Sequence, residues 1–377
     1  MIQLIQHVKL FREGEWRDSD ILLAGQKIAA VEDRIEISLP GLEVKDGQGM
    51  RAVPGYVDRH VHITGGGGEG GFSNEVPPIS ICAPLQGGVT TVVGLLGTDG
   101  LTRSVESLAA KAMALEEEGI TAYFLTGAYS YPSPTITGSV KKDIVMLKNC
   151  LGVKLAISDH RAPCIQSWEL ARLAADTWQA GILKGHPAFL HLHVGRGKTG
   201  LSQLFQLLEE TDLPISVFHP THMGNQIEDA VRFSKLGGWV DFTVMDDPER
   251  SAEQMVSALT RCPSELVTFS TDSNGSMPIW NDRQEMVGIS ACRISNLHAT
   301  VQALVQQKGL PLEQAVLPCT CNAARALNLS GKGRLTPGAD GDILLLDDRL
   351  EIQSVFALGK ELLREGALTF QPKFSDS

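Results

Sequence analysis

The chain has 377 residues, of which 43% are hydrophobic, and its formal net charge is -11. This length is sufficient for one large core and a smaller second domain. The acidic charge argues against nucleic acid or an anionic membrane as a partner, because both attract basic surfaces. Seven cysteines occur without CxxC spacing, and the first residues are charged where a signal peptide would be apolar, so we expect a cytoplasmic protein.

The first and last segments are predicted to differ from the middle of the chain. Residues 1–51 and 333–377 contain short strand-like runs separated by Gly, Asp and Pro turns. Neither end can bury a core alone. We therefore predict that the two ends join in a small composite β-sandwich domain beside the central domain.

The central segment, 52–332, alternates between apolar strand-like runs and helical stretches such as 104–119 and 200–212. The strand-like runs cover 52–60, 89–97, 120–129, 153–159, 188–195, 214–222, 239–247 and 266–275. Apolar strands that alternate with helices are typical of a parallel sheet covered on both faces. The eight runs indicate an α/β fold with a closed (β/α)₈ TIM barrel, and a doubly wound open sheet is the alternative.

The first of these strands ends in an unusual stretch, VDRHVHITGGGGEGG at 57–71. Residues i and i+2 of a strand point the same way, so His60 and His62 can reach one point. The glycine run that follows allows backbone to approach a bound group closely, and it carries Glu69. The stretch predicts a metal site beside a ligand-binding loop, with two half-buried histidines before a flexible turn as the alternative.

Further potential metal ligands follow the other strands. The active site of a TIM barrel lies at the carboxyl ends of its strands. The candidates there are His60, His62, Lys154, His193, His222 and Asp272. Their recurrence on five separate strands favours a metal centre over isolated structural histidines.

Lys154 is the exception among these candidates, because a protonated amine is repelled by a metal ion. If carbon dioxide carboxylates its amine, Lys154 becomes an anionic carbamate whose two oxygens can bridge two Zn²⁺ ions. The alternative is a lysine that forms a salt bridge inside the barrel.

The stretches GYVDRHVHITGGGGE, GVTTVVGLLGTD, LTGAY, TITGSV, GVKLAISDHR and STDSNGSMP resemble the isoaspartyl dipeptidase (β-aspartyl peptidase) family of the amidohydrolase superfamily. The resemblance extends over nearly the whole chain. It implies a distorted barrel that carries two Zn²⁺ ions, with His60 and His62 on one, His193 and His222 on the other, and carboxylated Lys154 between them. It also implies that Asp272 both binds metal and acts as the base.

The same resemblance implies roles in substrate binding. A metal-bridging hydroxide would attack the β-aspartyl amide, whose carbonyl oxygen Tyr129 would polarise. Glu69 would bind the substrate's α-ammonium, and Arg161 would bind the carboxylate of the leaving residue. The groups implied for the α-carboxylate and for a further hydrogen bond to the substrate are Gly67, Gly68, Thr98 and Ser276.

Several of these residues have simpler alternatives. Tyr129 can be an aromatic residue of the barrel rim, Thr98 a helix cap, and Arg161 a partner of Asp159. His191 is interpreted as a core histidine or a support for a metal ligand, and His160 and His219 as the other candidates for such support. The segment 280–286 is a candidate for part of a lid.

One departure from the family concerns the segment after His222. The family carries an arginine there that also binds the leaving residue's carboxylate, whereas this chain has Met223, Gly224 and Asn225. Leaving-residue preference therefore stays open, with Arg196 or Lys198 as candidates to compensate.

The resulting hypothesis is a cytoplasmic, homo-oligomeric, zinc-dependent dipeptidase, a metalloprotease whose substrate is a small dipeptide with a β-linked aspartyl residue. Its closest rival is an N-acyl-amino-acid deacylase or another amidohydrolase that acts on an ω-linked amino acid. A mononuclear deaminase fits less well, because it has no bridging lysine. A non-catalytic scaffold of the superfamily is the alternative outside enzymes.

Overall fold

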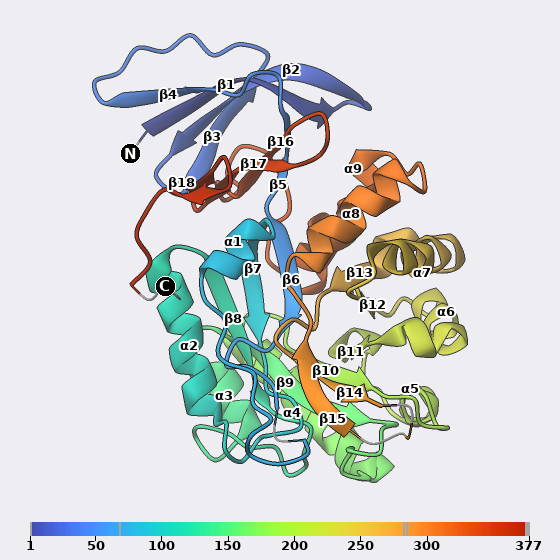
Figure 1. Ribbon diagram of the computed structural model, residues 1–377. Coiled ribbons are helices and arrows are strands. Elements are labelled where there is room, and N and C mark those ends of the chain that lie inside the picture. The colour runs from blue at the N-terminus through green and yellow to red at the C-terminus, as the bar shows by residue number, and fades with distance from the viewer. Residues whose placement is uncertain (1, 68, 282, 284–285, 374–377) are drawn as a thin grey trace.

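A computed structural model describes residues 2–67, 69–281, 283 and 286–373. Figure 1 shows two parts, a sheet built from both ends of the chain and a curled parallel sheet with helices around it. None of the helices in these ranges is both long and apolar enough to cross a membrane.

The central segment forms all eight predicted strands, six of them in the curled sheet and two in a separate pair. They are β6 (Tyr56–Val61), β7 (Val89–Gly94), β8 (Thr121–Gly127), β9 (Cys150–Ile157), β10 (Phe189–Val194), β11 (Phe218–Thr221), β12 (Val240–Thr243) and β13 (Val267–Ser270). Strands β6 to β11 pair in parallel and in chain order, and β12 pairs with β13. A parallel bridge between Val61 and Ser273 brings the end of β13 back to β6, which gives a TIM-barrel-type fold instead of an open sheet.

The burial of the strands explains why they form a sheet covered on both faces. Every residue of β6, β7, β9 and β10 is buried, including the polar ones. The helices that accompany the barrel are α1 (Cys82–Gln86), α2 (Val105–Glu118), α3 (Val140–Met146), α4 (Ser167–Lys184), α5 (Ser202–Glu210), α6 (Ile227–Lys235), α7 (Pro248–Arg261), α8 (Asn296–Gln306), α9 (Leu312–Ala315) and α10 (Cys321–Ala326). The stretch predicted at 104–119 is α2, which begins after the capping side chain of Ser104 and ends at Gly119 in the left-handed conformation.

The two chain ends share one nine-stranded sheet. Its strands are β1 (Ile2–Arg12), β2 (Glu15–Ala24), β3 (Lys27–Glu32), β4 (Leu42–Asp46), β5 (Arg51–Pro54), β16 (Ile343–Leu346), β17 (Ile352–Ala357), β18 (Lys360–Arg364) and β19 (Ala367–Leu368). The antiparallel pairing of β5 with β16 joins the amino-terminal and carboxyl-terminal strands. The arrangement of this sheet as a two-layer sandwich stays a prediction.

A hairpin extends from the end of the barrel that carries the candidate metal ligands. It consists of β14 (Ser276–Trp280) and β15 (Met286–Ala291), which are antiparallel. Residues 282 and 284–285 of the suggested lid lie outside the described part of the chain.

Candidate metal centre and substrate cavity

Asp272 lies at the centre of the predicted ligand set. Its Oδ1 atom is 3.2 Å from Nε2 of His60 and 3.0 Å from Nε2 of His62. One donor atom each from His60, His222 and Asp272 lies within 4.8 Å of the others. The first, sixth and eighth barrel strands therefore bring oxygen and nitrogen donors together, as the strand-end argument predicted.

Lys154 and His193 complete the group. The Nζ atom of Lys154 is 3.5 Å from Nε2 of His60. The ring of His193 lies 4.6 Å from that of His222, and the ring of His222 lies 4.9 Å from that of His60, measured between centroids. All six predicted ligands thus belong to one cluster of neighbouring side chains.

The hydrogen bonds around these histidines suit metal ligation. Nδ1 of His222 is 2.6 Å from the hydroxyl of Thr243, whereas its buried Nε2 has no partner among the described residues. His191 holds Nδ1 of His60 at 3.0 Å and leaves Nε2 directed at Asp272. Metal-binding histidines are commonly held in this way through the second ring nitrogen, and imidazole and carboxylate donors suit Zn²⁺.

Lys154 lies in the interior without any exposed surface. Burial lowers the pKa of its ammonium group to about 7, which makes the neutral amine accessible near neutral pH. A neutral amine is the form that reacts with carbon dioxide. The predicted salt-bridge alternative is not seen among the described residues, where no carboxylate lies within ion-pair distance of Lys154.

Two of the candidate ligands have strained backbones. His222 has φ = 64° and Asp272 has φ = 53°, both in the left-handed region that residues other than glycine rarely adopt. Such conformations persist where surrounding contacts impose them, and they cluster at functional sites. The conformations place both side chains at the ends of their strands, facing the cavity.

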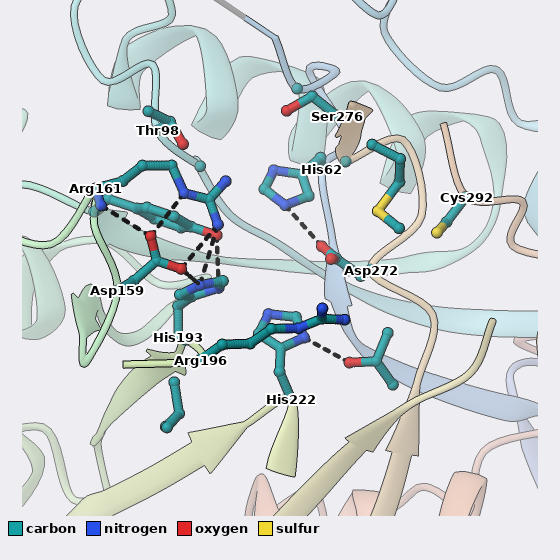
Figure 2. A pocket seen from close by; sticks show the side chains of 18 of the residues that line it. His62, Thr98, Asp159, Arg161, His193, Arg196, His222, Asp272, Ser276 and Cys292 are labelled. Carbon is teal, nitrogen blue, oxygen red and sulfur yellow. Dashed lines mark hydrogen bonds and ion pairs between the residues drawn. The ribbon is translucent and has the colours of Figure 1, made fainter. Parts of the chain in front are cut away.

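The ligand cluster borders a cavity of about 1250 Å³. Figure 2 shows His62, His193, His222 and Asp272 around its floor, with Thr98, Arg161 and Ser276 on the walls. The cavity is also lined by the predicted substrate residues Gly67, Glu69 and Tyr129. The structure thus brings together every predicted substrate residue except Gly68, which lies outside the described residues.

Arg161 is held by two carboxylates. It donates to both oxygens of Asp159, at 2.9 and 3.0 Å, and to Oε1 of Glu69 at 2.7 Å. Burial alone would lower the pKa of Arg161, but the hydrogen bonds that it donates to these carboxylates raise the pKa above its ordinary value. Arg161 therefore pairs with Asp159, as the alternative prediction had it. It also contacts Glu69, one of the predicted substrate residues.

Tyr129 and Thr98 both engage residues of the site. The hydroxyl of Tyr129 is 2.6 Å from Nδ1 of His193, whose Nε2 is 3.0 Å from Asp159. Because a carboxylate only accepts hydrogen bonds, Nε2 carries the proton and the lone pair of Nδ1 faces Tyr129. Thr98 donates to Glu69 at 2.8 Å, and the cap of the following helix is Ser104, so the interpretation of Thr98 as a helix cap is wrong.

The glycine run packs closely against neighbouring backbone and is not simply a flexible turn. Gly65 has φ = 81° and Gly67 has φ = 133°, and a Cβ atom at either position would collide with the backbone of residues 74–76. Gly66 packs against the backbone at 274–276 in the same way. These glycines therefore hold the loop against neighbouring backbone while it lines the cavity.

The remaining predicted residues have mixed outcomes. His191 supports His60, as interpreted from the sequence. His160 points to solvent, with 86% of its side chain exposed, although Nδ1 is 3.2 Å from Asp159. His219 instead contacts Arg59 at 2.6 Å and stacks on Phe189, away from the ligand cluster.

Sequence reasoning missed several residues of the cavity wall. Thr243 and Arg250 line it but carried no prediction, and Asp159 was considered only as a partner of Arg161. Asp159 and Thr243 follow or end β9 and β12, so the strand-end rule could have identified them. Arg250 lies in the first turn of α7 and had no such signal.

The segment after His222, where this chain lacks the arginine of the family, lies at the cavity. Met223, Gly224 and Asn225 form a 3₁₀ turn, and Gly224 and Asn225 line the cavity. Arg196 also lines it. Lys198 lies in a separate depression beside Phe205 and Arg232.

Comparisons with known proteins show what this chain is similar to in sequence and fold. The Amidohydrolase family model matches residues 218–362. The β-aspartyl dipeptidase of Fervidobacterium islandicum AW-1, solved in complex with a β-Asp-Leu dipeptide, is 37% identical, with a TM-score of 0.92 over 99% of this chain and 100% of that chain.

More distant proteins share parts or only the fold. A dihydroorotase of Staphylococcus epidermidis is 33% identical over 105 residues, which are 28% of this chain and only 24% of that enzyme's length. The dihydropyrimidinase of Brevibacillus agri NCHU1002 aligns over 98% of this chain and 96% of that chain, with a TM-score of 0.68. At 14% identity, that enzyme supports the fold alone.

Proposed function

This chain belongs to the β-aspartyl dipeptidase family of the amidohydrolases, a family of hydrolytic enzymes, and from that membership we propose that it cleaves the isopeptide bond of β-aspartyl dipeptides. The observation that carries the proposal is the cluster of six potential metal ligands at the floor of a cavity that also contains Glu69 and Arg161. A relative of 37% identity over the whole chain was solved with a β-Asp-Leu dipeptide, which supports this choice of substrate.

The proposed cofactor is a pair of Zn²⁺ ions. His60 and His62 would hold one ion, His193 and His222 the other, with carboxylated Lys154 between them and Asp272 as a further ligand. When bound, the ions supply an activated water as the nucleophile and polarise the amide carbonyl. The partnerless Nε2 of His222 and the lowered pKa of Lys154 support this ligand set.

In this proposal the protein's own groups orient the substrate and move the proton. Asp272 accepts the proton of the attacking water and passes it to the leaving amine. The hydroxyl of Tyr129, which in the free protein faces Nδ1 of His193, would instead donate to the carbonyl oxygen, whose negative charge grows as the amide is attacked. Ser276, at the start of β14, adds a hydrogen bond to the bound dipeptide.

Glu69 is proposed to bind the α-ammonium group of the substrate. Thr98 and the backbone around Gly67 and Gly68 would receive the α-carboxylate, and Arg161 would contact the carboxylate of the leaving residue. The ammonium group would replace Arg161 as the partner of Glu69, and the hydrogen bond at 2.7 Å from Arg161 to Glu69 supports this role, because it shows that Glu69 already accepts from a cationic group.

We also propose the division of the chain into a catalytic barrel, 52–332, and a composite β-sandwich domain, 1–51 with 333–377. A cytoplasmic location and a homo-oligomeric state complete the proposal. Size-exclusion chromatography with light scattering would test the oligomeric state.

A panel of substrates separates the proposal from its nearest rival. Purified protein loaded with zinc is expected to hydrolyse β-Asp-Leu and to leave N-acetyl-leucine unchanged, because Glu69 requires a cationic partner. Amine release is the measurement, and zinc content is measured on the same sample. Hydrolysis of N-acetyl-leucine without hydrolysis of β-Asp-Leu would instead identify an N-acyl-amino-acid deacylase. Protein that lacks stoichiometric zinc and is inactive on both would fit the non-catalytic scaffold.

A further inference from the structure

The arginine side chains of the cavity differ in whether they already form hydrogen bonds or ion pairs within the protein. The arginines among its described lining residues are Arg103, Arg161, Arg196 and Arg250. The guanidinium of Arg103 donates hydrogen bonds to the carbonyl oxygens of Thr64, Gly66 and Val76. The side chains of Arg196 and Arg250, by contrast, make no hydrogen bond or ion pair with the described residues.

A β-aspartyl dipeptide presents two carboxylates and one ammonium group. Arg161 can donate a hydrogen bond to one carboxylate, but the two oxygens of Asp159 already balance its charge. Release of Glu69 to the substrate's ammonium group leaves this pairing with Asp159 intact. Because Asp159 keeps balancing the charge of Arg161, neutralising the carboxylate of the leaving residue calls for another cation at the cavity wall.

The backbone on both sides of Arg196 is fixed. Gly195 donates to Ile157 at 3.2 Å, Gly197 donates to Ser158 at 2.6 Å, and an added Cβ at either glycine would collide with the segment 158–159. The amide of Gln226 also bonds to the carbonyl oxygens of Gly195 and Gly197, at 3.4 and 3.1 Å. An exposed side chain without a partner thus stands on a rigidly held loop.

The direction of this side chain is the second part of the argument. In Figure 2 the side chain of Arg196 extends across the cavity past His222 toward the side of Asp272. It reaches there from the loop after β10. Arg250 lines the same cavity from the exposed first turn of α7.

We propose that Arg196 binds the terminal carboxylate of the leaving residue together with Arg161 and so makes the enzyme select dipeptides over β-aspartyl amides. This assignment rests on the proposed function and adds a residue that binds the end of the substrate farthest from the aspartyl group. A guanidinium group is suited to the task, because its planar fork matches a carboxylate with two parallel hydrogen bonds.

The test compares kcat/KM for β-Asp-Leu with that for β-Asp-leucinamide, which lacks the terminal charge. Arg196→Met is expected to lower kcat/KM for β-Asp-Leu about 10- to 100-fold, the range for a hydrogen bond to a charged group, mainly through KM. The value for the amide should change less than about threefold, because the amide has no carboxylate to lose contact with. Arg196→Lys should recover part of the preference, since it restores the charge without the fork.

Lys198→Met is the matched control. It removes a positive charge from the same loop, but Lys198 lies in a separate depression. Both substrates should therefore be turned over as by the wild-type protein. Arg250→Met tests the other unpaired arginine of the cavity.

An equal loss on both substrates in Arg196→Met, or no loss on either, would overturn the assignment. Loss of the preference in Arg250→Met but not in Arg196→Met would overturn it too and would transfer the role to Arg250. In both cases the wild-type protein still cleaves β-Asp-Leu, so the proposed function survives. A wild-type protein that cleaves neither substrate would refute the proposed function and this assignment together.

Discussion

Replacement of Lys154 by alanine is expected to reduce kcat/KM for β-Asp-Leu roughly a thousandfold. Catalytic metals supply several kcal/mol of transition-state stabilisation, and each 1.4 kcal/mol is about a factor of ten in rate. Lys154 is fully buried 3.5 Å from His60, so its loss removes the proposed bridge at the centre of the ligand cluster. Zinc content should fall in parallel. Short carboxylic acids, which can occupy the vacated space and supply bridging oxygens, should restore part of the activity.

A second buried lysine provides the control for this variant. Lys332 contacts Thr121 and Asp342 and does not line the cavity. Lys332→Ala is expected to lower stability, because removing one partner of a buried ion pair leaves an uncompensated charge. Its remaining activity should not respond to carboxylic acids. A Lys154→Ala protein with wild-type activity and wild-type zinc content would show that Lys154 is not a metal bridge.

Glu69→Gln is expected to lower kcat/KM for β-Asp-Leu about a hundredfold or more, because loss of one partner of a buried charge pair costs about 2–5 kcal/mol. The substitution keeps the shape of the side chain and its hydrogen bond from Thr98, but it removes the charge proposed to bind the α-ammonium group. Bound zinc should stay close to the wild-type amount, since Glu69 is not one of the proposed ligands. Steady-state kinetics and metal analysis of the same preparation measure both effects.

Glu75→Gln is the control on the neighbouring segment. Glu75 is exposed and does not line the cavity, so its substitution should change turnover less than about twofold, as for most surface changes. If the wild-type protein cleaves an N-acetylated β-aspartyl dipeptide as fast as the free one, Glu69 does not select an ammonium group. The deacylase would then be the better hypothesis.

The strands and the ligand cluster were predictable because their signals are local. Near-continuous apolar runs gave the positions of all eight barrel strands, and the strand-end rule then selected His60, Lys154, His193 and Asp272 from a chain with ten histidines. The rule works because parallel strands in a barrel end on the same side. No pairing between distant side chains had to be known.

The pairing of side chains within the cavity was not predictable in the same way. Arg161 contacts Asp159 and Glu69 at once, whereas the sequence indicated only Asp159 as an alternative partner and gave no sign of the contact with Glu69. His160 was a candidate to support the ligands, but its side chain points to solvent. It follows β9 between Asp159 and Arg161, and the side chains of these two neighbours take the inward positions. Arg250 comes from a helix that follows another strand, so only the three-dimensional structure brings it to the cavity.

The measurement that tests the central claim most directly is the ratio of kcat/KM for β-Asp-Leu to that for α-Asp-Leu, on protein loaded with zinc. The two dipeptides have the same composition and charge, but they exchange the positions of the scissile carbonyl and the free carboxylate relative to the ammonium group. A site that hydrogen-bonds all of these groups should prefer the β-linked isomer roughly a thousandfold or more. Equal cleavage of the two isomers, or cleavage of α-Asp-Leu alone, would contradict the proposed function.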